Sequence, residues 1–338
     1  MRNIILCGQF LDFSGYAWAG RSYAKLFSNY FVNDRLFFVN DSVESHTKNI
    51  PEIELDKLKE NFGISDIEFT PIEELENLSG EVYYFECLIP STYLAKRYAN
   101  QLSPIDILDQ NKSINLIKIS MVAWESSVFS TLYASGIQVA GFDALLLHTR
   151  NHAEKLQAQI DLPVYINHYP VLELFNPQPQ NTKSAADKFN ILAFSAWNPR
   201  KGWDQLISAY YSEFFDCDDV SLTIKTHGDQ DEIISAIKKI KKDTTKFLVK
   251  VENNSKIQSS QSPPKCEVRI DLSQLSEKDI QGYFSNFDLF ASATKGEGFG
   301  LTIAQAGIAA LPVLVPNQGG HTDFCPQWAY QVDSFTAA

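Results

Sequence analysis

The sequence predicts an α/β protein with two domains, each built on a mainly parallel sheet covered by helices. Two observations carry this prediction. Short apolar runs that end in turn residues alternate with helical patterns along the chain, and such alternation favours parallel sheets. A polar stretch at residues 176–188, with two prolines and no periodicity, separates two such series and is predicted as a linker. We therefore expect an N-terminal domain at residues 1–178 and a C-terminal domain at residues 179–338, which agrees with a length of 338 residues at roughly 150 per domain.

The composition is that of a soluble globular enzyme and excludes several other classes of protein. Hydrophobic residues make up 44% of the chain, yet no apolar run approaches the ~20 residues of a membrane helix or resembles a signal peptide. With 29 basic and 41 acidic residues the formal charge is −12, which disfavours binding to nucleic acid or anionic membranes. The five cysteines stand singly without a Cys-x-x-Cys pair, so no disulfide framework is expected and a reducing, cytoplasmic location fits.

The N-terminal domain is predicted to open with a strand, a turn and a helix. Residues 3–7 form the strand, which Gly8 stops, and residues 12–15 form the turn. In the segment that follows, apolar side chains recur at spacings of three and four, the pattern of one buried helical face. They are Tyr16, Ala19, Tyr23, Leu26, Phe27 and Tyr30. Further strands are predicted at residues 36–39, 82–85, 116–121 and 144–147.

The C-terminal domain repeats this alternation of strands and helices. A helix with an aromatic-rich stripe is expected at about residues 206–215, and others near residues 233–240, from residue 277, and from residue 301 to a point before Pro312. Residues 252–265 are polar and are expected as a surface loop. Lysines gather at residues 238–246, where a solvated helix face is favoured over a patch for acidic lipids. Strands are predicted at residues 190–194, 220–224, 247–251, 268–270, 289–291, 313–315 and 329–332.

A glycine-rich turn between a strand and a helix, at residues 293–301, is the strongest local signal. Glycines let the backbone approach a ligand, and the first N–H groups of a helix lack intrahelical partners at the positive end of its dipole. The turn is therefore expected to bind an anionic group such as a phosphate, with Glu297 and Gln305 facing the same molecule. A tight turn with a capping acid is the alternative. No P-loop motif occurs, and Leu301 stands where a dinucleotide fingerprint needs its third glycine.

Residues 288–305 resemble a motif of the retaining glycosyltransferases of GT-B fold, in particular glycosyltransferase family four, which carries a Glu-x7-Glu pattern within a Glu-Gly-Phe-Gly-Leu context. Residues 198–209 are similar to the strand–loop–helix that opens the donor domain of that family, and Trp124-Glu125 is similar to a pair in one branch of it. The resemblance covers most of the chain and is most specific in the second domain. It implies two Rossmann-like domains that face each other across a cleft. Further similar segments are residues 142–149, residues 166–177, and Gly319-Gly320 with Asp323.

The resemblance also implies roles for individual residues in a site for a nucleoside-diphosphate sugar. Lys201 and Arg200 would neutralise the diphosphate, with Arg200 replacing a cation that the family has at the position of Ala196. Glu297 would hold hydroxyls of the transferred sugar. Gln305 stands where the family has its second glutamate, which grips the nucleotide ribose. Residues expected to contact phosphate or sugar oxygens, mostly through their backbone, are Ser14, Gly15, Gly298, Phe299, Gly300, Leu301, Gly319 and Gly320.

No metal and no cofactor are expected beyond the donor substrate itself. His148 and His152 lie four positions apart, a spacing that suits zinc on a helix, but no third ligand follows at a suitable position. In the implied site, Arg200 and Lys201 supply the positive charge that a metal would otherwise bring.

The sequence thus favours an enzyme that moves a sugar from a nucleoside-diphosphate sugar to an acceptor hydroxyl with retention of configuration, in glycan or glycoconjugate synthesis. The sugar and base of the donor stay open, as does the acceptor, whether glycan, lipid, protein or nucleobase. One alternative is a non-catalytic GT-B-like protein that binds nucleotide or glycan, which Gln305 favours. Another is a phage-type enzyme that glycosylates DNA bases, which the charge of −12 disfavours. Family members usually add a helix after the last predicted strand, and none is expected before Ala338.

Overall fold

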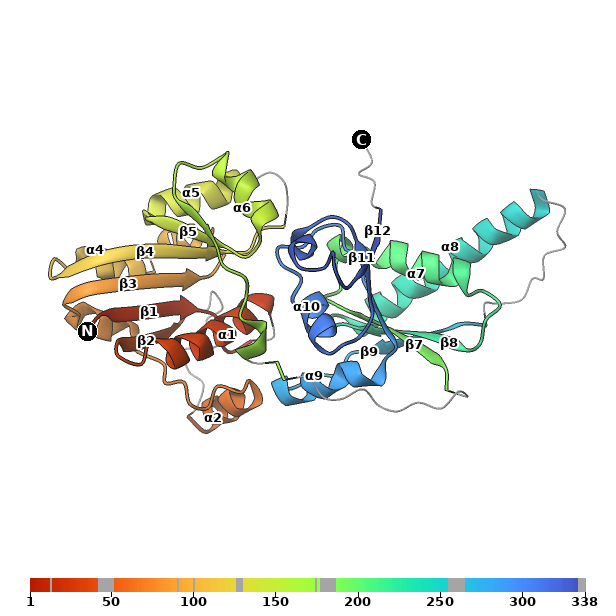
Figure 1. Cartoon of the computed structure of the whole chain (residues 1–338), viewed down its shortest axis with the longest axis horizontal. Coiled ribbons are helices and arrows are strands. Elements are labelled where there is room, and N and C mark those ends of the chain that lie inside the picture. The colour runs from red at the N-terminus through yellow and green to blue at the C-terminus, as the bar shows by residue number, and fades with distance from the viewer. Residues whose placement is uncertain are drawn as a thin grey trace. The chain divides into compact units, whose positions relative to one another are not determined.

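The chain forms two compact units, each with one parallel sheet (Figure 1). The computed structural model describes residues 1–12, 14–41, 52–89, 91–99, 101–125, 130–173, 175–176, 187–254 and 265–333. Unit 1 comprises residues 1–176 and 276–278, and unit 2 comprises residues 177–275 and 279–338. The expected boundary at residues 178 and 179 and most of the expected linker lie outside the described residues.

In unit 1 the sheet has the strand order β2-β1-β3-β4-β5-β6, and every pairing is parallel. The strands are β1 (Asn3–Gly8), β2 (Arg35–Asn40), β3 (Gly80–Cys87), β4 (Ile114–Val122), β5 (Ala144–Leu147) and β6 (Val164–Ile166). The helices are α1 (Gly15–Tyr30), α2 (Glu52–Asn61), α3 (Ser91–Tyr98), α4 (Pro104–Gln110), α5 (Thr131–Ala140) and α6 (Arg150–Gln157), with the 3-10 turns η2 (Ile72–Asn77) and η3 (Val171–Glu173).

Both faces of this sheet are covered. On one face, Ile5 of β1 shares a buried apolar cluster with Ile105 of α4 and Ile137 of α5. On the other face, the ring of Phe85 in β3 meets the edge of Phe27 in α1, with ring centroids 5.1 Å apart. Strands that are buried on both faces read as continuous apolar runs in the sequence, which is why these strands are predictable.

Unit 2 has the strand order β12-β11-β10-β7-β8-β9, again with parallel pairings. The strands are β7 (Phe189–Phe194), β8 (Val220–Lys225), β9 (Glu267–Asp271), β10 (Leu289–Ala291), β11 (Val313–Pro316) and β12 (Tyr330–Val332). The helices are α7 (Trp203–Glu213), α8 (Gln230–Asn254), α9 (Glu277–Tyr283) and α10 (Leu301–Ile308), with the 3-10 turns η4 (Pro199–Lys201), η5 (Phe284–Asn286) and η6 (Gly320–Asp323).

One predicted strand of this unit is wrong. Residues 247–251 lie within α8 and not in a strand. A short apolar run does not distinguish a strand from a piece of helix, and here the helix that begins at Gln230 continues through the run. The helix also takes up residues 252–254 of the expected surface loop, whose residues 255–264 lie outside the described residues. Within the described part of the chain, neither α8 nor any other helix is long and apolar enough to cross a membrane.

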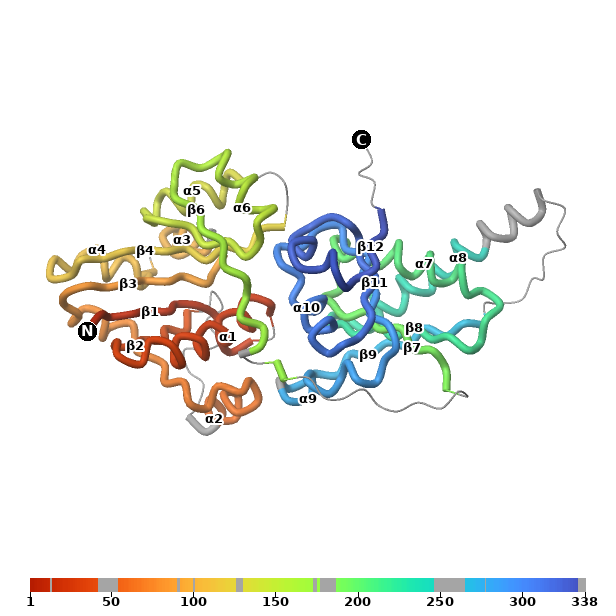
Figure 2. Tube along the Cα trace, viewed as in Figure 1, coloured from red at the N-terminus to blue at the C-terminus, as the bar shows by residue number. Residues whose placement is uncertain are grey.

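The order of strands in unit 2 singles out the carboxyl ends of β7 and β10. From β7 the chain adds β8 and β9 on one side, and it then returns to the other side of β7 to add β10, β11 and β12, a path that can be followed along the trace in Figure 2. In open parallel sheets of this kind, ligands bind outside the carboxyl ends of the two strands at which the order reverses. The loops that leave these two strands carry Arg200, Lys201 and Glu297.

Candidate functional site

The loop after β7 brings two cations against the loop after β10. Pro199 opens the 3-10 turn η4, and Arg200 and Lys201 complete it. Gly202 follows with a φ of +66°, and a Cβ on it would lie 2.0 Å from the carbonyl oxygen of Ala293. Glycine alone tolerates both the left-handed backbone and this close approach. The glycine at position 202 therefore allows the two loops to pack together.

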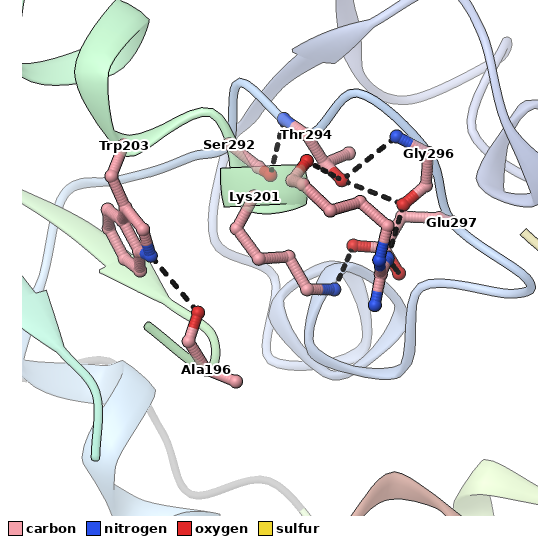
Figure 3. A network of polar contacts seen from close by, with 8 residues as sticks. Ala196, Lys201, Trp203, Ser292, Thr294, Gly296 and Glu297 are labelled. Carbon is pink, nitrogen blue, oxygen red and sulfur yellow. Dashed lines mark hydrogen bonds and ion pairs between the residues drawn. The ribbon is translucent and has the colours of Figure 1, made fainter. Parts of the chain in front are cut away.

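Hydrogen bonds join the two loops. The backbone N–H of Lys295 donates to the carbonyl oxygen of Arg200 at 2.7 Å. The buried hydroxyl of Thr294 donates to the carbonyl oxygen of Gly296 at 3.0 Å, which closes the turn onto itself. Figure 3 shows the hydrogen bond between Thr294 and Gly296 with other residues of the site. The turn that carries Glu297 is thus fixed relative to Arg200 and Lys201 by the backbone.

Ala196, at the position where the resemblance implies another cation, contacts an indole ring through its backbone. The Nε1–H of Trp203 donates to the carbonyl oxygen of Ala196 at 3.0 Å (Figure 3). The ring of Trp197 stacks on that of Trp203, with centroids 5.2 Å apart. Ala196 supplies no charge, and the cations that the structure places against Glu297 are Arg200 and Lys201 of η4.

Glu297 lies between the two cations of η4. Its Oε1 is 2.5 Å from Nζ of Lys201, and its Oε2 is 3.7 Å from Nη1 of Arg200. Nη1 of Arg200 also donates to the carbonyl oxygen of Gly296. Figure 3 shows the Lys201 ammonium pointing at the Glu297 carboxylate, and these two side chains are only 12% and 11% exposed. Charges with this little exposure are screened weakly by salt. We call Arg200, Lys201 and Glu297 the ion triad.

The helix that follows the turn begins at a glycine. Gly300 is the N-cap residue of α10 with a φ of +94°, and it has no side chain to cap the helix. A helix start of this kind offers backbone N–H donors and a positive dipole end to an anion. The predicted contacts of Gly298, Gly300 and Leu301 are compatible with this geometry. The ring of Phe299 packs on that of Phe324, with centroids 4.8 Å apart, so its side chain is part of the core.

The predicted glycine pair lies directly against Glu297. The N–H of Gly320 donates to the carbonyl oxygen of Glu297 at 2.7 Å. Gly319 has a φ of +110°, and a Cβ on it would lie 3.3 Å from the backbone nitrogen of Glu297. The structure therefore brings this pair together with the ion triad, and its approach to a sugar stays a prediction. Gln305 lies in α10 and is 4% exposed; its contact with a ribose stays a prediction.

Sequence reasoning missed His321, which follows the glycine pair. Its side chain is fully buried, and its Nε2 lies 2.8 Å from the carbonyl oxygen of Pro316. Burial lowers the pKa of His321, although the Glu297 carboxylate opposes the shift. A neutral imidazole that donates from Nε2 holds the turn of Gly319 and Gly320 to the end of β11. Its place directly after a glycine pair is the feature of the sequence that could have indicated such a role.

In unit 1, Ser14 and Gly15 begin α1. The Ser14 hydroxyl oxygen accepts a hydrogen bond from the N–H of Ala17 at 3.0 Å, and the Ser14 N–H donates to Oδ1 of Asp12 at 2.6 Å. Ser14 is thus an N-cap residue, which stabilises the start of α1. A contact of Ser14 or Gly15 with a diphosphate stays a prediction.

The two histidines with zinc-like spacing have protein surroundings of their own. His148 precedes α6 and stacks on Tyr169 with ring centroids 3.6 Å apart, and its Nδ1 lies 2.9 Å from the carbonyl oxygen of Asn167. Burial lowers the pKa of His148 to about 3. His152 lies in α6, with its Nδ1 2.9 Å from the hydroxyl of Thr149. Among the described residues, no group of three or more His, Cys, Asp or Glu side chains is placed to hold a metal ion.

Comparison with known proteins gives structural neighbours only. No protein-family model and no curated protein matches the chain. A Staphylococcus aureus TarM variant in complex with UDP, α-GlcNAc-glycerol and fondaparinux is 11% identical, with a TM-score of 0.64 over 99% of this chain and 90% of that one. The pneumococcal O-GlcNAc transferase GtfA with UDP and GlcNAc is 12% identical, with a TM-score of 0.59 over 99% and 88%. Anabaena HepE with UDP and glucose is 14% identical, with a TM-score of 0.56 over 98% and 86%.

The fold is GT-B. The prediction of the fold class from the sequence is thereby confirmed. In this GT-B chain, unit 2 carries the ion triad, the start of α10 and the glycine pair, whereas Ser14 and Gly15 belong to unit 1.

Proposed function

We propose that the chain is a glycosyltransferase that moves a sugar from a nucleoside-diphosphate sugar to an acceptor hydroxyl with retention of configuration. The ion triad at the carboxyl ends of β7 and β10 carries this proposal. The GT-B fold supports it, and TarM, GtfA and HepE were each solved with UDP. We therefore propose a uridine nucleotide sugar as the donor. Retention is supported by the similarity to trehalose-6-phosphate synthase, described as transferring with retention, at 12% identity and a TM-score of 0.55.

The cations of the triad would stabilise the leaving group. When the bond between the sugar and the diphosphate breaks, negative charge grows on the leaving phosphate oxygen. Lys201 and Arg200 are held beside the turn before α10, and the start of this helix, whose N-cap residue is Gly300, adds backbone N–H donors. Groups that are already oriented toward such charge stabilise it without reorganising. We propose that they act without a metal ion, and transfer that persists in excess EDTA is the expected result.

The carboxylate of the triad would recognise the sugar. Each oxygen of Glu297 accepts hydrogen bonds, and sugar hydroxyls are suitable donors. Gly319 and Gly320 lie against the backbone of Glu297, and the missing Cβ of Gly319 lets this turn pack closely on Glu297 and His321. Gln305, in the second turn of α10, would bond the ribose hydroxyls with one oxygen and two N–H donors.

A panel of nucleotides tests this function. UDP, GDP, ADP, UDP-glucose and UDP-GlcNAc are added to the wild-type chain and to two lysine variants, and the melting temperature is measured. A ligand at 100 times its Kd stabilises by about 2.7 kcal/mol. UDP is expected to stabilise the wild type and Lys295→Ala but hardly Lys201→Ala. Lys295 is the matched control because it lies on the same turn but pairs with Asp204 at the surface.

Measurements of turnover and of DNA binding distinguish the proposed glycosyltransferase from the two alternative functions. With a nucleotide sugar that binds, we expect release of UDP by slow hydrolysis or by transfer to added glycan acceptors. Tight binding without any release would support a non-catalytic protein. Binding of duplex DNA that weakens steeply with salt would support the enzyme that modifies DNA bases. If no nucleotide shifts the melting temperature of the wild type, the donor site is rejected.

A further inference from the structure

We propose that Glu297 competes with the nucleotide diphosphate for Lys201 and Arg200, and that this competition makes the site prefer a nucleotide sugar to the free nucleoside diphosphate. The inference rests on the proposed function and deepens it, because it assigns Glu297 a role in specificity besides holding the sugar. It starts from one observation: the carboxylate expected to grip the sugar is bound to both cations expected to grip the phosphates.

The ion pairs of Glu297 with Lys201 and Arg200 are held in place by the backbone around them. Glu297 is 8% exposed, and its carbonyl oxygen is held by the N–H of Gly320. Arg200 is held through its carbonyl oxygen by the N–H of Lys295. Both ends of the ion triad are therefore anchored by backbone hydrogen bonds, and the side chains meet because of where the loops are placed. A surface ion pair between two mobile side chains would lack these constraints.

A free nucleoside diphosphate meets this triad at a disadvantage. Its phosphate oxygens must either share the Lys201 ammonium with Glu297 or displace the carboxylate. Two anions on one ammonium lie within roughly 5 Å of each other and repel strongly at low exposure. A displaced Glu297 would be left in a nearly dry position with fewer partners, which is costly for a carboxylate.

A nucleotide sugar removes this disadvantage. Its sugar hydroxyls donate to Glu297 and replace the bond from Lys201, so that the ammonium turns to the phosphates without leaving a bare carboxylate. Binding of the sugar part and capture of the diphosphate part are then coupled. After transfer the sugar departs with the acceptor, Glu297 returns to Lys201, and the nucleoside diphosphate is released more readily. The same contact thus disfavours inhibition by the product.

The test uses Glu297→Gln, which keeps the shape of the side chain and removes its charge. By titration calorimetry, UDP is expected to bind the variant roughly three- to tenfold more tightly than the wild type, because a charged hydrogen-bond acceptor has been removed from Lys201. UDP-glucose or UDP-GlcNAc is expected to bind no more tightly than before, so the preference for the nucleotide sugar shrinks. Asp204→Asn is the control: it makes the same charge change on an exposed partner of Lys295 and should leave UDP binding unchanged.

A measurement on the wild type keeps the test independent of how well the variant folds. Glucose or GlcNAc at a concentration that binds should raise the affinity for UDP, and by linkage UDP should raise the affinity for the sugar by the same factor. Weaker UDP binding by a folded Glu297→Gln variant would overturn the coupling. So would an affinity of the wild type for UDP that is the same with and without bound sugar. Either result leaves the proposed function intact. A wild type that binds no nucleotide would overturn both.

Discussion

Gly202 lies so close to Ala293 that a single methyl group would separate the two loops of the candidate site. A Cβ on Gly202 would stand 2.0 Å from the carbonyl oxygen of Ala293, and the φ of Gly202 is +66°. This contact lies between η4, which holds Arg200 and Lys201, and the turn that holds Glu297. The ion triad therefore depends on the absence of a side chain at position 202.

We expect Gly202→Ala to destabilise the protein and to abolish nucleotide binding. The strained backbone and the clash together should cost about 2 kcal/mol or more, because the carbonyl in the way is backbone and cannot rotate aside. Thermal melts and UDP titration measure both effects. Gly63→Ala is the control, since Gly63 has the same φ of +66° with nothing within 4 Å of the added Cβ. It should cost roughly 1 kcal/mol and leave UDP binding unchanged. Normal UDP binding by Gly202→Ala would show that the two loops need not be in contact.

Lys201→Ala should weaken UDP binding by about 1.5–3 kcal/mol, the range for a hydrogen bond to a charged group. The sequence predicts that Lys201 is a cation on a loop and that its loss hardly changes the stability of the free protein. In the structure its side chain is 12% exposed and 2.5 Å from Glu297, so a modest loss of stability is expected as well.

The double variant Lys201→Ala/Glu297→Gln separates the two effects. Removing both charges should restore the melting temperature of the free protein, because no carboxylate is left short of a partner. UDP binding should remain weak, because the ammonium is still missing. If the double variant binds UDP as tightly as Glu297→Gln alone, Lys201 does not contact the nucleotide.

The elements around the site could be predicted because their signals are local. The apolar strands β7 and β10 are bounded by turn residues, and the glycines at 296, 298 and 300 mark a turn before a helix. The strand predicted at residues 247–251 failed because a short apolar run carries too little information to separate strand from helix.

The ion triad could not be predicted from the sequence, because it depends on non-local geometry. Lys201 and Glu297 stand in motifs far apart in the chain, and only the side-by-side pairing of β7 with β10 brings their loops together. The resemblance gave each residue a separate ligand and did not indicate that they bond each other.

Gln305→Glu should lower the melting temperature of the free protein, because it places a new carboxylate at a position that is 4% exposed. If ribose hydroxyls bind there, UDP gives that carboxylate two donors and should raise the melting temperature more in the variant than in the wild type. The difference between the two UDP-induced shifts is the quantity to compare. Equal shifts would place Gln305 outside the nucleotide site, and a smaller shift in the variant would indicate that the site needs the carboxamide.

Glu86 makes the stability of unit 1 depend on pH. It lies in β3, is 3% exposed and accepts a hydrogen bond from the Tyr84 hydroxyl at 2.9 Å. The groups that face it are Cys7 of β1, Asp41 after β2 and Lys96 of α3, and Lys96 is paired with Asp41. Burial raises the pKa of Glu86 from 4.5 to about 7, with Asp41 adding to the shift and the Tyr84 hydrogen bond opposing it.

A raised carboxyl pKa means that the folded state binds the proton more tightly than the unfolded state. Between pH 4.5 and about 7 the folded chain therefore carries more protons, and the free energy of unfolding falls as the pH rises through this window. The loss is at most on the order of 3 kcal/mol, because each unit of pKa corresponds to about 1.4 kcal/mol. Above pH 7 the contribution of Glu86 no longer changes, since both states are ionised.

Glu86→Gln should remove this dependence. The variant is expected to unfold at a higher urea concentration than the wild type at pH 8, and the two should converge as the pH falls toward 4.5. The amide oxygen can still accept the Tyr84 hydrogen bond, but its N–H donors need partners in a buried place, which reduces the gain. Glu81→Gln is the control, because Glu81 lies exposed at the start of the same strand; its unfolding curve should follow the wild type at every pH. A gap between Glu86→Gln and the wild type that stays constant from pH 5 to pH 8 would show that Glu86 does not titrate in this range.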